Sequence, residues 1–271
     1  AVEALIVLFN DSIMDVRNDA VAAMASMGAV TVDRLIAALK DERWRVREHA
    51  AKTCGEIKDP KAVEALMLVC RDRDGAVKSA AAEALGKIRD PKAIPALTKL
   101  FRDPSKTVRE TAGTALISIG QPSVDPLMEC LTDKDFIVRC HAARALGWMT
   151  TDYQIGRTWV RDSKVVDILI ATLKDPDRAV REDATIALGQ IGDPRAIDAL
   201  IEAMKDGVVK RHAIASLGMI GDPRALPPVL DALKGKGIRQ DGTPTPGCIV
   251  SEDAFIKEAA ATALGQFRDP R

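Results

Sequence analysis

Apolar residues recur at spacings of three and four along nearly the whole chain. The stretch 59–91, DPKAVEALMLVCRDRDGAVKSAAAEALGKIRDP, shows the pattern most clearly. Its apolar positions form two stripes, Val63, Leu66, Met67 and Cys70, then Val77, Ala81, Leu85 and Ile88. Spacings of this kind place apolar side chains on one face of a helix. The stretch therefore predicts two amphipathic helices, helix A and then helix B.

Polar residues and glycine mark the expected ends of these helices. Asp59 can cap helix A, and Pro60 suits the first helical position, where no N–H is needed. The charged run 71–74 with Gly75 is expected to end helix A. Two helices of about 12 residues joined by a short turn form an antiparallel hairpin that cannot bury its stripe alone, so copies must stack.

The copies can be counted from a Val-Arg or Val-Lys pair that opens helix B. These pairs begin at Val16, Val46, Val77, Val108, Val138, Val180 and Val209, and Ile256-Lys257 is an eighth. The successive steps are 30, 31, 31, 30, 42, 29 and 47 residues. Small residues follow each pair, as in AAEALGKI. We expect them to allow close approach between hairpins, and we expect the Gly to help end the helix.

The repeat DPRAIxALxxxxxDxxxxVRxxAxxALGxIGD resembles the short HEAT-like repeat named after phycobilisome lyases, over essentially all 271 residues. This resemblance implies an all-α fold, a right-handed α-solenoid of about eight helical hairpins, with residues 1–271 as a single domain. It also implies a ladder in which turn aspartates bond to the Arg after the Val of a neighbouring repeat. The turn aspartates are Asp11, Asp41, Asp72, Asp103, Asp133 and Asp175, each five residues before the Val.

The regular array is interrupted by insertions and is expected to be cut at both ends. The chain opens within a helix A and closes on Asp269-Pro270-Arg271, so both ends are expected to lie within repeats of a longer array. Insertions fall at about 150–162 and 235–250. The first carries Tyr153 and Trp159 close to Trp148, either as an aromatic anchor for a partner or as cover for an apolar gap. The second is rich in Gly and Pro and is expected to be mobile.

Composition narrows the choice of partners. Lys+Arg and Asp+Glu both number 39, so no long-range field favours nucleic acid. No apolar run reaches the roughly 18 residues of a membrane span. The five cysteines form no CxxC pair, which favours a reducing cytoplasm. Cys54, Cys70 and Cys130 are expected in the core, and Cys140 and Cys248 are expected to be accessible.

The three histidines do not predict a metal site. His49, His141 and His212 each lie three residues after the Val of helix B. Helices pack about 8 to 10 Å apart, so His49 and His141 should lie roughly 25 to 30 Å apart, too far to share an ion. Deoxyhypusine hydroxylase, a HEAT-like enzyme that the chain resembles in architecture, holds iron with His-Glu pairs, whereas Glu48-His49 has the reverse order. No cofactor is expected.

A row of charges of both signs follows the surface of helix B. It comprises Glu48, Lys52, Glu110, Arg144, Glu182, Arg211 and Glu258. The row is either a solvated face or the lining of a concave groove that contacts a complementary protein. Together with Trp148, Tyr153 and Trp159, its members are the candidate partner-binding residues.

These patterns favour a non-catalytic scaffold or adaptor that binds another protein through the concave helix B face and the inserted loops. Charges spread along an array do not converge as catalytic groups do, so the sequence leans against an enzyme. The alternative, implied by the resemblance, is a bilin lyase or isomerase that acts on a light-harvesting protein. Fold alone does not decide between them.

Overall fold

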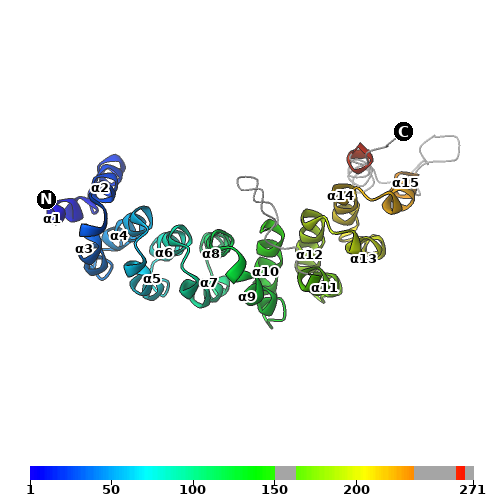
Figure 1. Cartoon of the computed structure of the whole chain (residues 1–271), viewed down its shortest axis with the longest axis horizontal. Helices are drawn as coiled ribbons and strands as arrows, with labels where there is room; N and C mark the ends of the chain where they lie inside the picture. Colours follow the sequence, from blue (N-terminus) through cyan, green and yellow to red (C-terminus); the bar gives the residue numbers. More distant parts are fainter. Residues whose placement is uncertain (150–162, 235–260, 266–271) are drawn as a thin grey trace. The chain divides into compact units, whose positions relative to one another are not determined.

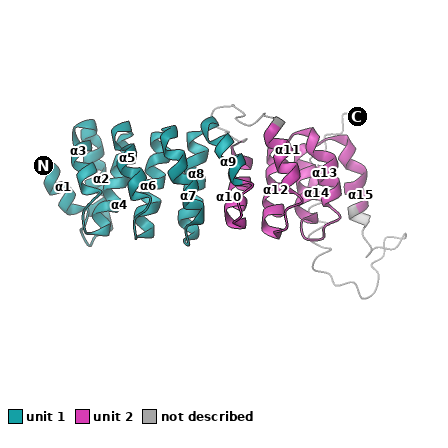
Figure 2. Ribbon diagram, turned by 90° about the horizontal axis from the view of Figure 1, so that it is seen from below, with its two compact units in different colours: residues 1–130 teal, residues 131–271 magenta. Residues whose placement is uncertain are grey.

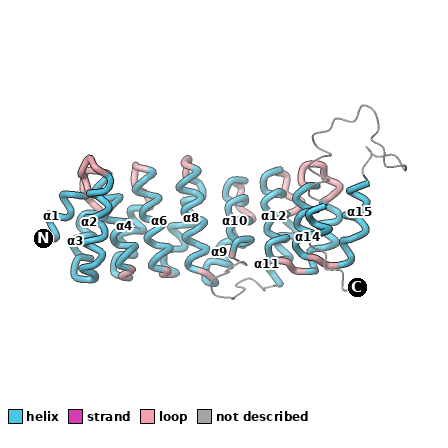
Figure 3. Tube along the Cα trace, turned by 90° about the horizontal axis from the view of Figure 1, so that it is seen from above, coloured by secondary structure: helices cyan, strands magenta, loops and turns pink. Residues whose placement is uncertain are grey.

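The computed structural model describes residues 1–149, 163–234 and 261–265, and all its assigned elements in these ranges are helical (Figure 1, Figure 3). The predicted all-α solenoid is confirmed. The chain divides into two compact units, residues 1–130 and 131–271 (Figure 2). Both insertions and the eighth Val-Arg-like pair lie outside the described residues.

Unit 1 consists of stacked hairpins arranged in two layers (Figure 1). The helix A layer contains α1 (Val2–Leu8), α3 (Val32–Ala38), α5 (Val63–Val69), α7 (Ile94–Lys99) and α9 (Val124–Cys130). The helix B layer contains α2 (Met14–Met27), α4 (Trp44–Ile57), α6 (Gly75–Ile88) and α8 (Lys106–Ile119). Each helix B packs against its own helix A, and α2, α4, α6 and α8 pack side by side as successive helices B.

Unit 2 repeats the same arrangement. Its labelled helices among the described residues are α10 (Phe136–Trp148), α11 (Ser163–Thr172), α12 (Arg178–Ile191), α13 (Ile197–Ala203), α14 (Lys210–Ile220) and α15 (Leu226–Lys234), and residues 261–265 are also helical. The helices α10, α12 and α14 pack side by side as successive helices B. The apolar stripes meet inside each hairpin, and Leu146, Leu188 and Leu217 are fully buried.

The starts of both helices differ from the sequence-based expectation. Asp59 caps as predicted, because its carboxylate accepts a bond from the Lys61 N–H at 2.9 Å. The residues that follow, Pro60–Ala62, form a 3₁₀ turn before α5 begins. Gly75 does not end helix A. It is the first residue of α6, whose cap is Asp74, and the Asp74 carboxylate accepts a bond from the Ala76 N–H at 2.9 Å.

The glycine of the AALG segment permits close helix packing and does not end the helix. A Cβ placed on Gly86 would lie 2.8 Å from the Ala115 Cα of α8, and one on Gly55 would lie 2.8 Å from the Ala84 Cα of α6. The helix α6 instead ends at Arg89, which adopts a positive φ of 61°. The prediction of close approach is confirmed, and the prediction that this Gly ends the helix is wrong.

We expect Gly86→Ala to lower the free energy of unfolding by about 1–3 kcal/mol, because the added methyl group would overlap the backbone of α8. The matched control is Gly113→Ala within α8, where the nearest atom to a new Cβ is the Phe101 ring at 3.8 Å. That change should stabilise the helix by about 0.5–1 kcal/mol. Denaturant titration followed by circular dichroism measures both effects. Changes of the same sign in the free energy of unfolding of both variants would contradict the close-packing interpretation.

One stretch is apolar enough to resemble a membrane span. Residues Met14–Ala38 form a continuous helical segment with a mean hydropathy of 1.4 over its most apolar window. Gly28 divides this segment, since its φ of 68° lies in the left-handed region at the end of α2. The two parts are helix B of the first hairpin and helix A of the second. The apolar composition here therefore belongs to two stacked hairpins.

Candidate functional site

Charged residues of the turns link neighbouring repeats, as the repeat resemblance implied. The Arg47 Nε donates to Asp72 Oδ2 at 2.6 Å, and Arg47 Nη2 donates to Asp72 Oδ1 at 2.9 Å. The third nitrogen, Nη1, donates to the Asp41 carbonyl of its own turn at 2.8 Å. One guanidinium therefore binds two turns, and this part of the ladder is confirmed.

The ladder continues through other repeats. The further links are Lys78 to Asp103, Arg139 to Asp175, and Arg181 to Asp206. Sequence reasoning missed Asp206, which lies three residues before Val209, because it searched for an aspartate five residues before each Val. The shortened step of 29 residues in this repeat was the available signal. These charges therefore join neighbouring repeats.

The link expected from Arg17 to Asp41 is not formed. The Arg17 Nη1 donates to the Asp11 carbonyl at 2.7 Å, but its Nε is buried without a hydrogen-bond partner. Asp41 is bound instead by Arg43, whose Nε and Nη2 donate at 2.9 and 2.8 Å. These Arg43 bonds hold the pKa of Asp41 below its ordinary value. Arg43, in the same turn as Asp41, therefore binds the carboxylate that would otherwise link the first two repeats.

The members of the predicted helix B row in unit 1 lie on two helices, α4 and α8, that are separated by α6. Glu48 is only 15% exposed and accepts a bond from Lys52 Nζ at 2.6 Å, so these two residues are already paired on α4. Glu110 lies on α8, two hairpins further along, and its carboxylate is 3.6 Å from Lys106 Nζ. Glu110 borders a groove of 460 Å³ between α6 and α8, together with Glu83, Lys87, Thr107, Thr111, Thr114 and Ser118.

The members of the row in unit 2 also form pairs. Arg144 Nη2 of α10 donates to both carboxylate oxygens of Asp183 on α12 at 3.0 Å. Glu182 accepts a bond from Arg178 Nε at 3.0 Å, and Arg211 Nη2 lies 3.2 Å from His212 Nε2. The Arg144–Asp183 pair joins two repeats, so Arg144 has a structural role that sequence reasoning did not identify.

The aromatic candidates are only partly described. Trp148, the last residue of α10, is 54% exposed. Tyr153, Trp159 and Glu258 lie outside the described residues. Trp148 therefore offers exposed aromatic surface near the first insertion, as a partner contact would require.

Cys140 is buried, which corrects the expectation that it is accessible. It contacts the Asp183 carboxyl through a hydrogen bond on the face of α10 that packs against α12. Burial raises the pKa of the Cys140 thiol to about 12. Cys54 and Cys70 are buried as predicted, and Cys130 is only partly buried. Cys248 lies outside the described residues. The prediction failed because Cys140 lies off the stripe that faces helix A but on the side that faces the next helix B.

The histidines lie within packed surroundings. His49 is buried, its Nδ1 is 2.7 Å from the Arg45 carbonyl oxygen, and its ring lies 5.9 Å from that of Phe9. His141 is also buried, and His212 is half-buried. In the part of the chain that the structure describes, no group of three or more His, Cys, Asp or Glu side chains is arranged to hold a metal ion.

The free energy of unfolding should fall as the pH decreases below about 6.5, the ordinary histidine value. Burial lowers the pKa of both His49 and His212, so each stays neutral in the folded chain at a pH where the unfolded chain binds a proton. Thermal melts between neutral and mildly acidic pH measure how steeply stability falls with pH. The double variant His49→Asn and His212→Asn should flatten this slope, whereas Thr111→Asn, at the same repeat position, should not. An unchanged slope in the double variant would contradict this assignment.

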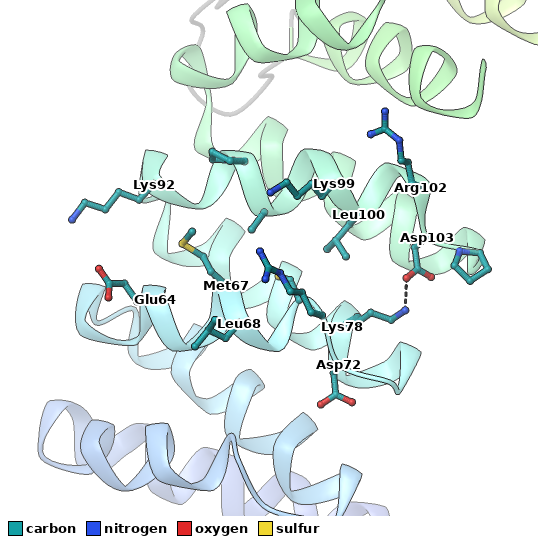
Figure 4. A pocket seen from close by; sticks show the side chains of 15 residues that line it. Glu64, Met67, Leu68, Asp72, Lys78, Lys92, Lys99, Leu100, Arg102 and Asp103 are labelled. Atoms are coloured by element: carbon teal, nitrogen blue, oxygen red, sulfur yellow. Dashed lines mark hydrogen bonds and ion pairs between the residues drawn. The ribbon is translucent and has the colours of Figure 1, made fainter. Parts of the chain in front are cut away.

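Two larger grooves lie on the helix A side of unit 1, where the sequence predicted no site. One, of 740 Å³, lies between α5 and α7, and the other, of 660 Å³, lies between α3 and α5. Figure 4 shows Met67 and Leu68 of α5 facing Lys99 and Leu100 across the first groove. Glu64 and Lys92 lie at one end of it, and the Lys78–Asp103 pair lies at the other (Figure 4).

Comparison with known proteins supports the repeat assignment. The model of the HEAT repeats matches residues 32–117, 99–155 and 153–210, and that of the PBS lyase HEAT-like repeat matches residues 209–235. A search of curated proteins finds no match.

Three solved structures illustrate the similarity of fold. Escherichia coli YibA is 22% identical, with a TM-score of 0.54 over 98% of this chain and 91% of that one. The Kap95:Nup1 complex contains a chain that is 15% identical, with a TM-score of 0.66 over 97% of this chain and 40% of that one. The complex of CpcE and CpcF of phycocyanin lyase from Nostoc sp. PCC7120 is 25% identical over 85% of this chain and 92% of that one. Its TM-score of 0.42 is too low to support an argument.

Proposed function

This chain belongs to the HEAT-repeat family, with repeats of the PBS lyase type, and we propose that it is a non-catalytic scaffold that binds another protein through its helix B face. Stacked repeats create extended surfaces that suit protein partners. The Kap95:Nup1 complex, similar in fold, is a complex between two proteins.

The groove between α6 and α8 is the observation that supports this proposal. It is an open groove of 460 Å³ on the helix B side, and Glu83, Lys87 and Glu110 give it charges of both signs. Threonine and serine side chains line the rest. Such a lining can match a complementary charged and polar surface, and it leaves no enclosed space for a small substrate. Trp148 supplies exposed aromatic surface on the helix B layer of unit 2.

The charged groups of the described residues also favour binding over catalysis. The Arg47–Asp72, Arg139–Asp175 and Arg144–Asp183 pairs each join two repeats. Groups engaged in this way hold hairpins together, whereas catalysis requires groups that converge on one reacting atom. The alternative of a bilin lyase or isomerase is compatible with the repeat type, but no contact among the described residues favours it. The free cysteines of the described part suit the cytoplasmic setting that we propose.

Site-specific photocrosslinking in the source cell tests the helix B surface. A photoreactive residue at Thr111, inside the groove, should capture a discrete partner, and one at Asp198, exposed on α13, should not. Equal capture from both positions would contradict the proposal.

Charge reversal provides a second measure of the same surface. Glu110→Lys should reduce copurification of that partner several-fold, because Glu110 borders the groove. Glu202→Lys is the matched control, since Glu202 is an exposed helix A glutamate of unit 2 paired with a lysine. Trp148→Ala, Tyr153→Ala and Trp159→Ala extend the test to the proposed aromatic contact. Retention of the partner by all four site variants would remove this surface from consideration.

A further inference from the structure

The two grooves on the helix A side of unit 1 share one helix. The groove of 740 Å³ lies on one side of α5, and the groove of 660 Å³ lies on the other. Leu68, Glu64 and Arg71 line both. We call this pair of grooves, with the part of α5 between them, the α5 surface. It is separate from the helix B surface of the proposed function, so either proposal can fail without the other.

The middle of the α5 surface is apolar. Leu68 is 66% exposed although its neighbours Leu66 and Val69 are buried, so it projects away from the core between the two grooves. The apolar walls on either side include Ile36, Leu39, Met67, Pro95, Ala96 and Leu100. A large apolar side chain exposed beside two apolar grooves is a feature of interaction surfaces.

The rims of the α5 surface carry an excess of positive charge. Asp72 and Asp103 are neutralised by Arg47 and Lys78. Glu64 has no ion-pair partner among the described residues. The cations that likewise form no ion pair within the described ranges are Lys40, Arg71, Arg73, Lys92 and Lys99. Five such cations against one such anion make this surface basic, although Lys+Arg and Asp+Glu balance at 39 each over the chain.

We propose that the α5 surface binds an acidic amphipathic segment of a partner protein. Apolar side chains of the segment enter the two grooves beside Leu68, and its carboxylates lie over the unpaired cations of the rims. Apolar anchors with complementary charge around them are the usual means by which a groove recognises a short segment. Nucleic acid would satisfy the cations but leave Leu68 and the apolar walls without a matching group.

The spacing of the grooves restricts the sequence of the segment. Neighbouring helices pack about 8 to 10 Å apart, so the grooves on the two sides of α5 lie on the order of 10 Å apart. In a polyproline II segment, residues three apart lie about 9 Å apart on one side. In an α-helix, residues seven apart lie about 10.5 Å apart on one side. The segment therefore carries two apolar residues at one of these spacings, flanked by Asp or Glu.

Selection from a random-peptide phage library against the full chain tests this proposal. The enriched peptides should be acidic and carry a pair of apolar residues at one of the two spacings. Fluorescence anisotropy with a labelled peptide of the enriched sequence then measures affinity. Leu68→Gln, and separately the double variant Arg71→Glu and Lys92→Glu, should each weaken binding about tenfold or more. All these side chains are exposed, so circular dichroism and thermal melts should be unchanged.

Two matched controls lie in unit 2. Met219 is 51% exposed on α14, and Lys174 is an exposed cation after α11. Met219→Gln and Lys174→Glu should change the affinity by less than about twofold. The proposal is overturned if no acidic peptide is enriched, if replacing the apolar pair of the peptide by serine leaves its affinity unchanged, or if Leu68→Gln binds as well as the controls. Tighter, strongly salt-dependent binding of a single-stranded oligonucleotide that Arg71→Glu abolishes would also overturn it.

Discussion

Leu85→Ala should lower the free energy of unfolding by about 2–5 kcal/mol, the cost of removing a buried leucine side chain and leaving a cavity. Leu85 is 0% exposed and lies on α6, which packs against α4, α5 and α8. A cavity at this position therefore weakens contacts with two neighbouring hairpins as well as with its own. Urea titration followed by the helical circular dichroism signal measures the loss.

Leu68→Ala is the matched control for this prediction. Leu68 lies two residues after Leu66 on α5 of the same hairpin, on the opposite side of the helix, and it is 66% exposed. Its removal should change the free energy of unfolding by less than about 0.5 kcal/mol. A loss below about 1 kcal/mol for Leu85→Ala would mean that Leu85 does not lie at the centre of the packed stripe.

Asp72→Ala should lower the free energy of unfolding by about 2–4 kcal/mol, close to the cost of breaking a buried ion pair from one side. The Arg47 and Asp72 side chains are 8% and 11% exposed. Burial alone would raise the pKa of Asp72, but its bonds from Arg47 Nε and Nη2 and from the Asp74 N–H hold that pKa below its ordinary value. Without Asp72, the Arg47 guanidinium is left mostly buried and short of an acceptor.

A double-mutant cycle measures the interaction energy between the Arg47 and Asp72 side chains, apart from their other contacts. If the pair dominates, Asp72→Ala combined with Arg47→Met should cost clearly less than the sum of the two single changes. The control is Glu83→Gln, which removes an exposed partner of Lys87 on α6 and should cost less than about 1 kcal/mol. Additive losses in the cycle would show that the two side chains act independently.

The repeat architecture could be predicted because its signals are local. Apolar spacing around Leu66 and Leu85 set the two stripes, and the Asp-Pro pair at Asp59 marked the cap that the structure contains. The turn aspartates and the Arg after each Val also recur at fixed offsets, so the Arg47–Asp72 link followed from the repeat resemblance.

The features that the sequence did not predict depend on contacts between repeats. Gly86 has no cap geometry, and its role emerges only from the position of Ala115 on the next helix B. Cys140 and Arg144 lie outside the stripe that faces helix A, yet both contact Asp183 on α12. A stripe drawn on one helix shows one packed face, whereas an inner helix B packs on three sides.

The candidate surfaces also depend on contacts between repeats, which the sequence of one repeat does not show. The sequence did not show that three members of the helix B row, Glu48, Lys52 and Arg144, are held in the Glu48–Lys52 and Arg144–Asp183 ion pairs. The α5 surface was missed because its cations come from different repeats in a chain whose total charge is zero. Leu68 lies off the helix A stripe, and only the neighbouring helices show that grooves lie on both sides of it.

The missing link at Arg17 has a consequence for the order in which the chain opens. The first hairpin is attached to the second without a buried clamp like the one between Arg47 and Asp72, and the Glu3–Arg34 ion pair between these hairpins is exposed. No residue within α1 is buried, and the apolar contact of this part of the chain with the second hairpin comes from Phe9, directly after the helix. Amide hydrogens of α1 and α2 should therefore exchange with deuterated solvent well before those of α4 and α6. The first hairpin would open by itself, because the Arg43 bonds to Asp41 leave no buried charge pair to hold it to the second hairpin.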